Sequence, residues 1–126
     1  MVDFDPHIET DGIAGAFAIA KAMAIMGRSA TILMDKHCEE IMKEVVDGYF
    51  KEISPELLSR VDLQCFNCGK GGLSEAEKKR LAELSTSCDA LVSIERPSVN
   101  PDGAYMTMRA IDIIGLTSTF DQYLFP

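Results

Sequence analysis

The chain has 126 residues, which suits a single domain, and 47% of them are hydrophobic, enough for a buried core and too many for a disordered chain. Twenty acidic residues against twelve Lys and Arg give a formal net charge of −8. Such a surface repels phosphate backbones and anionic headgroups, so we expect no nucleic-acid partner and no membrane partner. The apolar run over residues 13–26 is too short to span a bilayer and is interrupted by Lys21.

Apolar periodicity and local capping signals predict helices that alternate with short strands. Gly27 suits the left-handed residue that follows a helix end, and Ser54-Pro55 suits an N-cap followed by the first helical residue. Ser74 and Glu77 have the spacing of a capping box. In chain order we expect a helix over 13–26, a strand over 31–34, a helix over 37–53 with one further turn over 56–60, a strand over 61–66, a helix over 74–87, a strand over 90–94 and one helical turn over 120–125.

This alternation predicts an α/β fold, a three-layer sandwich with a mostly parallel sheet and helices on both faces, in one domain over residues 1–126. The expected strands are apolar without alternation, as in parallel strands that are covered on both sides. An α/β fold normally has a strand before its first helix, whereas residues 1–8 are polar and contain Pro6. We therefore expect an incomplete sheet.

Ligands of open α/β sheets bind beyond the carboxyl ends of the strands, beside helix N-termini. Two stretches are expected at that edge, residues 9–15 at the first helix and residues 95–109 after the last strand. Together they supply carboxylates, two arginines and the backbone N–H groups of a first helical turn, which bind anions. Simpler roles exist for the same residues: Asp11 as a helix cap, residues 100–103 as a turn, and Glu95 as an ordinary surface charge.

The four cysteines do not form a recognisable metal or disulfide pattern. Cys65 and Cys68 make one Cys-x-x-Cys pair, but a second pair is absent, and a Gly-rich loop rather than a helix follows. We therefore expect reduced thiols in an intracellular compartment, with no metal and no cofactor. A small thiol-redox protein is an alternative that rests only on this pair.

At the two stretches named above, the sequence resembles the D-glutamate cyclase family. Glu9-Thr10-Asp11-Gly12, followed by Gly15-Ala16 and a helix of small residues, is similar to the opening motif of the family. Ile94-Glu95-Arg96-Pro97, followed by the residues from Asp102 to Arg109, is similar to its second motif. The family also has a later Gly-rich stretch without a counterpart in these 126 residues, so we expect a partial domain.

The resemblance implies a carbon–oxygen lyase that converts D-glutamate to 5-oxo-D-proline with loss of water, and a location in the mitochondrial matrix. By charge and position, we assign the two arginines to the substrate carboxylates, Glu9 or Asp11 to the amine proton, and Glu95 to orienting an arginine. The expected catalytic residues are Glu9, Asp11 and Glu95, and the expected substrate-binding residues are Gly12, Gly15, Arg96, Asp102, Tyr105 and Arg109.

A hypothesis from a different class is a non-catalytic α/β domain. It would bind a small anionic ligand or pair with another chain, because a sheet that lacks a strand exposes an edge that promotes self-association. A homo-oligomer is the expected result of such pairing. Turnover of D-glutamate distinguishes the two hypotheses.

Overall fold

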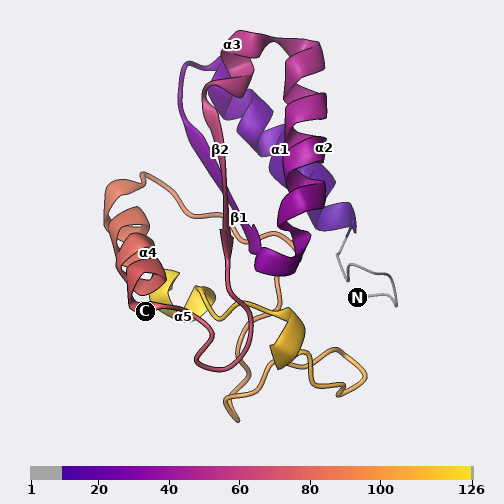
Figure 1. Cartoon of the computed structure of the whole chain (residues 1–126), viewed down its shortest axis with the longest axis vertical. Coiled ribbons are helices and arrows are strands. Elements are labelled where there is room, and N and C mark those ends of the chain that lie inside the picture. Colours follow the sequence, from indigo (N-terminus) through magenta and orange to yellow (C-terminus); the bar gives the residue numbers. More distant parts are fainter. Residues whose placement is uncertain (1–9, 126) are drawn as a thin grey trace.

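The computed structural model describes residues 10–125 and, within the first helix, side chains from Gly12 onward. The predicted absence of a strand in residues 1–8 lies outside this range. No helix among residues 10–125 is long and apolar enough to cross a membrane. In chain order the elements are α1 (Thr10–Ile25), β1 (Ala30–Asp35), the 3-10 turn η1 (Lys36–Cys38), α2 (Glu39–Ile53), α3 (Pro55–Leu58), β2 (Val61–Phe66), α4 (Glu75–Ser87), the 3-10 turn η2 (Ile114–Leu116) and α5 (Asp121–Leu124) (Figure 1).

The strands β1 and β2 form a two-stranded parallel sheet, in register from Ala30 opposite Val61 to Asp35 opposite Phe66. Parallel strands need a crossover connection, which α2 and α3 supply. Both strands therefore end at the same edge of the sheet. Asp35 lies at that edge and is followed directly by η1.

Helices cover both faces of this sheet. On one face Ile32 packs with buried side chains of α1 and α2, and on the other Phe66 packs with those of α4 and α5. Leu33, the neighbour of Ile32, contacts the second cluster, because successive side chains of a strand point to opposite faces. Figure 1 shows α1 and α2 together on one side of the strands and α4 with α5 toward the other. The α/β class predicted from the sequence is confirmed.

Local signals set three of the helix ends as predicted, whereas α1 begins at Thr10 rather than at residue 13, so that Asp11 lies within the helix and not at its N-cap position. The Ser74 hydroxyl accepts from the Glu77 N–H at the start of α4, and the Glu77 carboxylate accepts from the Ser74 N–H. Ser54 caps α3 by accepting from the N–H of Glu56. Gly27 has a φ of 78° just after α1, a conformation that suits glycine.

The strand predicted over residues 90–94 does not form. Val92 is 63% exposed, and Ile94 packs against Gly15 of α1 rather than joining the sheet. A strand needs a neighbouring backbone to bond, and in the described part of the chain none pairs with this segment. Its composition alone therefore does not produce a strand, and the sheet is smaller than predicted.

Two valine substitutions test this correction. Val46 is 4% exposed in the cluster between α1 and α2, whereas Val92 is 63% exposed. We expect Val46→Ala to lower the free energy of unfolding by about 1.5–3 kcal/mol, because it removes buried methyl groups and leaves a cavity. Val92→Ala should lower it by less than about 0.5 kcal/mol. Urea denaturation followed by circular dichroism measures both, and equal losses would mean that residues 90–94 are buried after all.

Candidate functional site

The two stretches predicted to form the site meet at the first turn of α1. A β carbon placed on Gly12 would lie 3.2 Å from both the β carbon of Glu95 and the carbonyl oxygen of Ile94. At Gly15 it would lie 3.4 Å from Cγ2 of Ile94. The contacts at Gly12 leave little room for a β carbon, whereas those at Gly15 are ordinary van der Waals contacts, so Gly12 is the residue that allows the segment around Ile94 to lie directly on the helix.

Glu95 has an unusual backbone conformation, with a φ of 48°. A positive φ costs free energy for a residue with a β carbon, and it persists only where surrounding contacts hold it. The Glu95 side chain is exposed, and it begins beside Gly12 at the first turn of α1. The positive end of the helix dipole favours a negative charge at this place.

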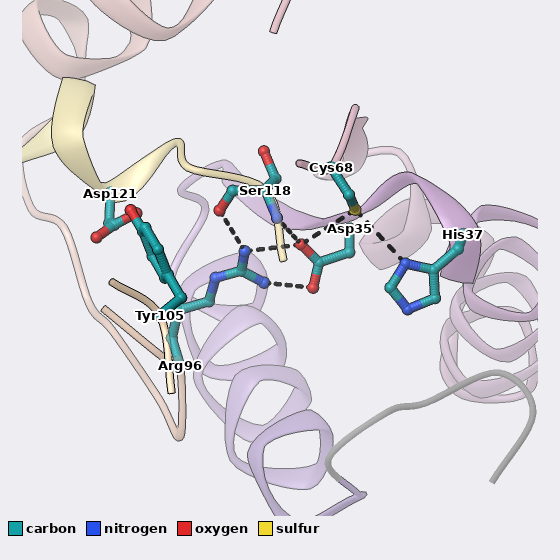
Figure 2. A network of polar contacts seen from close by, with 7 residues as sticks. All are labelled: Asp35, His37, Cys68, Arg96, Tyr105, Ser118 and Asp121. Atoms are coloured by element: carbon teal, nitrogen blue, oxygen red, sulfur yellow. Dashed lines mark hydrogen bonds and ion pairs between the residues drawn. The ribbon is translucent and has the colours of Figure 1, made fainter. Parts of the chain in front are cut away.

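Arg96, the next residue, turns into the interior and binds Asp35 at the end of β1 (Figure 2). Its Nη1 donates to Asp35 Oδ2 at 2.6 Å, and its Nη2 donates to Asp35 Oδ1 at 2.7 Å. The two side chains are only 14% and 12% exposed, so water screens this bidentate pair weakly. Asp35, rather than Glu95, is the carboxylate that orients Arg96 in the structure.

Further contacts complete the ion pair. The Ser118 N–H donates to Asp35 Oδ1 at 2.6 Å, and Arg96 Nη2 also donates to the Ser118 carbonyl at 2.8 Å. The guanidinium carbon lies 4.1 Å from the centre of the Phe120 ring, a cation–π contact. The Nε of Arg96 is buried and has no partner among the described residues. A substrate carboxylate would have to displace Asp35 to bind this guanidinium in the same bidentate way.

The buried side chain of Tyr105 connects the second motif to α5. It is 1% exposed, its hydroxyl donates to Asp121 Oδ1 at 2.7 Å, and it accepts from Gln122 Nε2 at 2.9 Å. Burial, followed by the bond to Asp121, raises the pKa of Tyr105 to about 12. The other Asp121 oxygen accepts from the backbone N–H of Val99 at 3.4 Å. This carboxylate therefore binds two separate parts of the segment that follows Arg96.

Asp102 and Arg109 are exposed on the loop over residues 100–112. An isolated antiparallel bridge between Met106 and Asp112 closes the part of this loop that contains Arg109, and Met108 near the tip of that part is fully exposed. Within the described part of the chain, no hydrogen bond or ion pair involves the side chain of Asp102 or Arg109. Both side chains are therefore available to a ligand.

The structure brings together only some of the predicted residues. Gly12 and Glu95 meet at the first turn of α1, whereas Gly15, further along the helix, meets Ile94. Those placed elsewhere are Arg96 and Tyr105, which face the interior, and Asp102 and Arg109, on the exposed loop. Glu9 and the side chain of Asp11 lie outside the described residues. The catalytic and substrate-binding roles of all nine residues stay predictions.

Three residues that the sequence did not single out hold this region together: Asp35, Ser118 and Asp121. Asp35 carried a usable signal, because it ends an apolar strand, and polar groups at the carboxyl ends of parallel strands lie where ligands bind. Ser118 and Asp121 come from a stretch without clear periodicity, and their sequence context gives no comparable signal.

A model of the family described as D-glutamate cyclase-like, C-terminal, matches residues 1–125. The chain belongs to the D-glutamate cyclase-like family. The resemblance seen in the two motifs is thereby confirmed over nearly the whole sequence of this D-glutamate cyclase-like domain. No curated protein and no solved structure matches the chain.

One thiol of the D-glutamate cyclase-like domain lies beside the ion pair. Cys68 Sγ is 3.5 Å from His37 Nδ1 and 3.8 Å from Asp35 Oδ1, to which it donates (Figure 2). Burial, followed by the charge of Asp35, raises the pKa of Cys68, so the thiol stays protonated as a further donor to Asp35. Among residues 10–125, no group of three or more His, Cys, Asp or Glu has a geometry that could hold a metal ion.

Alkylation tests the thiol-redox alternative. The pKa of Cys38 and that of Cys65 are raised to about 11, in each case mainly by burial. Because the thiolate is the reacting form, we expect iodoacetamide near neutral pH to label the exposed Cys88 first and these two thiols slowly. Peptide mass mapping over time follows each site. Rapid labelling of Cys65 or Cys68 would support the redox alternative.

The buried tyrosine predicts a loss of stability at alkaline pH. The pKa of Tyr105 is raised from 10 to about 12 in the folded chain, so its contribution is complete below pH 10 and is lost as the pH rises toward 12. We expect Tyr105→Phe to flatten the decline in the free energy of unfolding over this window. Tyr123→Phe, at an exposed tyrosine, should leave the decline as it is. Urea denaturation at a series of pH values measures both, and an unchanged slope in Tyr105→Phe would contradict this role.

Proposed function

We propose that this domain converts D-glutamate to 5-oxo-D-proline with loss of water. Membership of the D-glutamate cyclase-like family over residues 1–125 supports the proposal. The observation that supports it is the contact between Gly12 and Glu95, in which the Glu95 side chain begins beside the N-terminal turn of α1. A role in D-amino acid metabolism and a location in the mitochondrial matrix belong to the same proposal and rest on the family alone.

The proposed reaction joins two ends of one molecule. The amine nitrogen attacks the side-chain carboxyl carbon, a C–N bond forms, and a C–O bond breaks. The released oxygen leaves as water with the two protons that the ammonium group loses, so no proton is gained or lost overall. A base must take a proton from the ammonium group before the attack, and an acid must give one to the leaving oxygen. One carboxylate can serve in both steps.

Glu95 fits the role of this carboxylate in our proposal. Its side chain is exposed and begins beside Gly12, so a ligand at the first turn of α1 can reach it. The positive end of the α1 dipole would stabilise the charge that develops on the attacked carboxyl oxygen. Glu9 and Asp11, the bases predicted from the sequence, are the alternatives, because they come just before Gly12 in the chain.

Arg109 is the cation proposed to hold the other substrate carboxylate. Arg96 is already bound to Asp35, whereas Arg109 is exposed on its loop. An arginine that binds a carboxylate through two hydrogen bonds fixes its orientation. If one carboxylate is fixed in this way and the other must reach α1, the amine faces Glu95 in only one enantiomer. This arrangement would select one enantiomer, and the choice of D-glutamate over L-glutamate rests on the family alone.

Turnover tests the proposal directly. We expect the chain to form 5-oxoproline from D-glutamate and not from L-glutamate, as followed by NMR. Arg109→Ala should lower kcat/KM by about 10- to 100-fold, because it removes charged hydrogen bonds to the substrate. Arg28→Ala removes an exposed arginine beyond the other end of α1 and should leave turnover unchanged. If Arg109→Ala leaves both kcat and KM untouched, the anchoring role fails.

A second candidate is a non-catalytic domain that binds a small anion or pairs with another chain. One observation favours it: β1 pairs only with β2, so within the described chain its outer edge has no neighbour. Open sheet edges promote association, which would give a homo-oligomer. Binding of D-glutamate without lactam in the same NMR experiment would favour this candidate. A dimer mass by light scattering would support the pairing.

A further inference from the structure

We propose that Asp35 is a positioning residue that holds Glu95 in its strained conformation through Arg96. Only the catalytic use of the Glu95 carboxylate rests on the proposed function. The holding itself is a property of the fold, and stability measurements test it without any turnover.

Glu95 has to be held, because its φ of 48° is unfavourable for a residue with a β carbon. In the described chain, Ala110 is the one other non-glycine residue with a positive φ. An unrestrained loop would relax into the α or β region. The Glu95 side chain is exposed, so its own packing does not supply the restraint. The restraint must come from the residues on either side of it.

Both neighbours of Glu95 are fixed by residues that are distant in sequence. On one side, the Ile94 carbonyl lies 3.2 Å from the β-carbon position of Gly12 on α1. On the other side, two hydrogen bonds of 2.6 and 2.7 Å hold Arg96 on Asp35. Ile94 thus packs closely against a helix, Arg96 is bound to a strand, and residue 95 has to connect the two.

Asp35 is itself fixed in one orientation. It ends β1, its Oδ1 accepts from the Ser118 N–H at 2.6 Å, and the Cys68 thiol donates to the same oxygen at 3.8 Å (Figure 2). Because donors from three segments converge on this carboxylate, it cannot rotate without losing several of them. Asp35 therefore transmits a fixed position to Arg96.

The consequence for chemistry is the direction of the Glu95 side chain. With its positive φ, the β carbon of Glu95 lies 3.2 Å from the β-carbon position of Gly12, at the first turn of α1. A relaxed backbone would point the Cα–Cβ bond elsewhere and move the carboxylate away from this turn. A misplacement of about 1 Å in a reacting group costs roughly a hundredfold in rate. Asp35 would thus control a group that it does not touch.

Substitution by glycine measures the strain. Glu95→Gly should raise the melting temperature by about 2–5 °C, because glycine adopts a positive φ without steric cost. In an Asp35→Asn background residue 95 can relax, so the same substitution should raise the melting temperature by much less. Ala110→Gly is the matched control: it relieves a φ of 58° on the exposed loop, so its gain should be the same in both backgrounds.

Equal gains from Glu95→Gly in the two backgrounds, or no gain in either, would overturn the proposal. Asp35→Asn leaves Arg96 buried without a full partner, and that single variant can fail to fold. In that case Asp35→Asn combined with Arg96→Gln serves as the background, because this neutral pair leaves no buried charge. With this double variant as the background, equal gains from Glu95→Gly, or no gain in either background, would again overturn the proposal.

Kinetics with D-glutamate supply the second readout. Asp35→Asn should lower kcat by about 10- to 100-fold with little change in KM. Asp47→Asn changes an exposed aspartate on α2 and should leave kcat unchanged. In a Glu95→Gln background, Asp35→Asn should cause no further loss, whereas losses that multiply would show that Asp35 does not act through Glu95. If the wild-type chain makes no lactam, the proposed function fails, and the melting temperatures still decide the role of Asp35.

Discussion

The arrangement of the segments around the carboxyl end of β1 depends on the buried ion pair between Asp35 and Arg96. Taking two charges out of water is costly, and their attraction offsets the cost only when the geometry is good and further hydrogen bonds are made. The chain meets this requirement by bringing the Ser118 backbone and the Phe120 ring to the same place. Three segments that are distant in sequence are thereby fixed together: the end of β1, the second motif and the approach to α5.

Adjacent residues of the second motif face in opposite directions. Arg96 points into the interior, where it joins segments, and Glu95 points outward at the start of α1. In a strand, successive side chains alternate in this way without strain. No strand forms over residues 90–94, and a positive φ at Glu95 produces the separation instead. A short sheet with helices on both faces is sufficient to support this arrangement.

Most elements could be predicted because their signals are local, as in the capping box at Ser74 and the apolar run of β2. The first turn of α1 meets Glu95 as predicted, although the strand over residues 90–94 on which that prediction relied does not form. The pair of Asp35 and Arg96 could not be predicted, because two single charges 61 residues apart look like surface charges until the fold buries them. Residues 90–94 have the composition of a strand, but pairing depends on a neighbour that no local signal reports.

The loop over residues 100–112 combines a fixed base with a tip that buries little. Tyr105 binds Asp121 in the interior, while Met108 is fully exposed. The entropy of closing a loop grows slowly with its length, and exposed tips tolerate inserted residues. Insertions, deletions and substitutions at this tip, next to Arg109, can therefore occur while the base of the loop and the core stay intact. The tip is the part of the domain where sequence changes would cost the least stability.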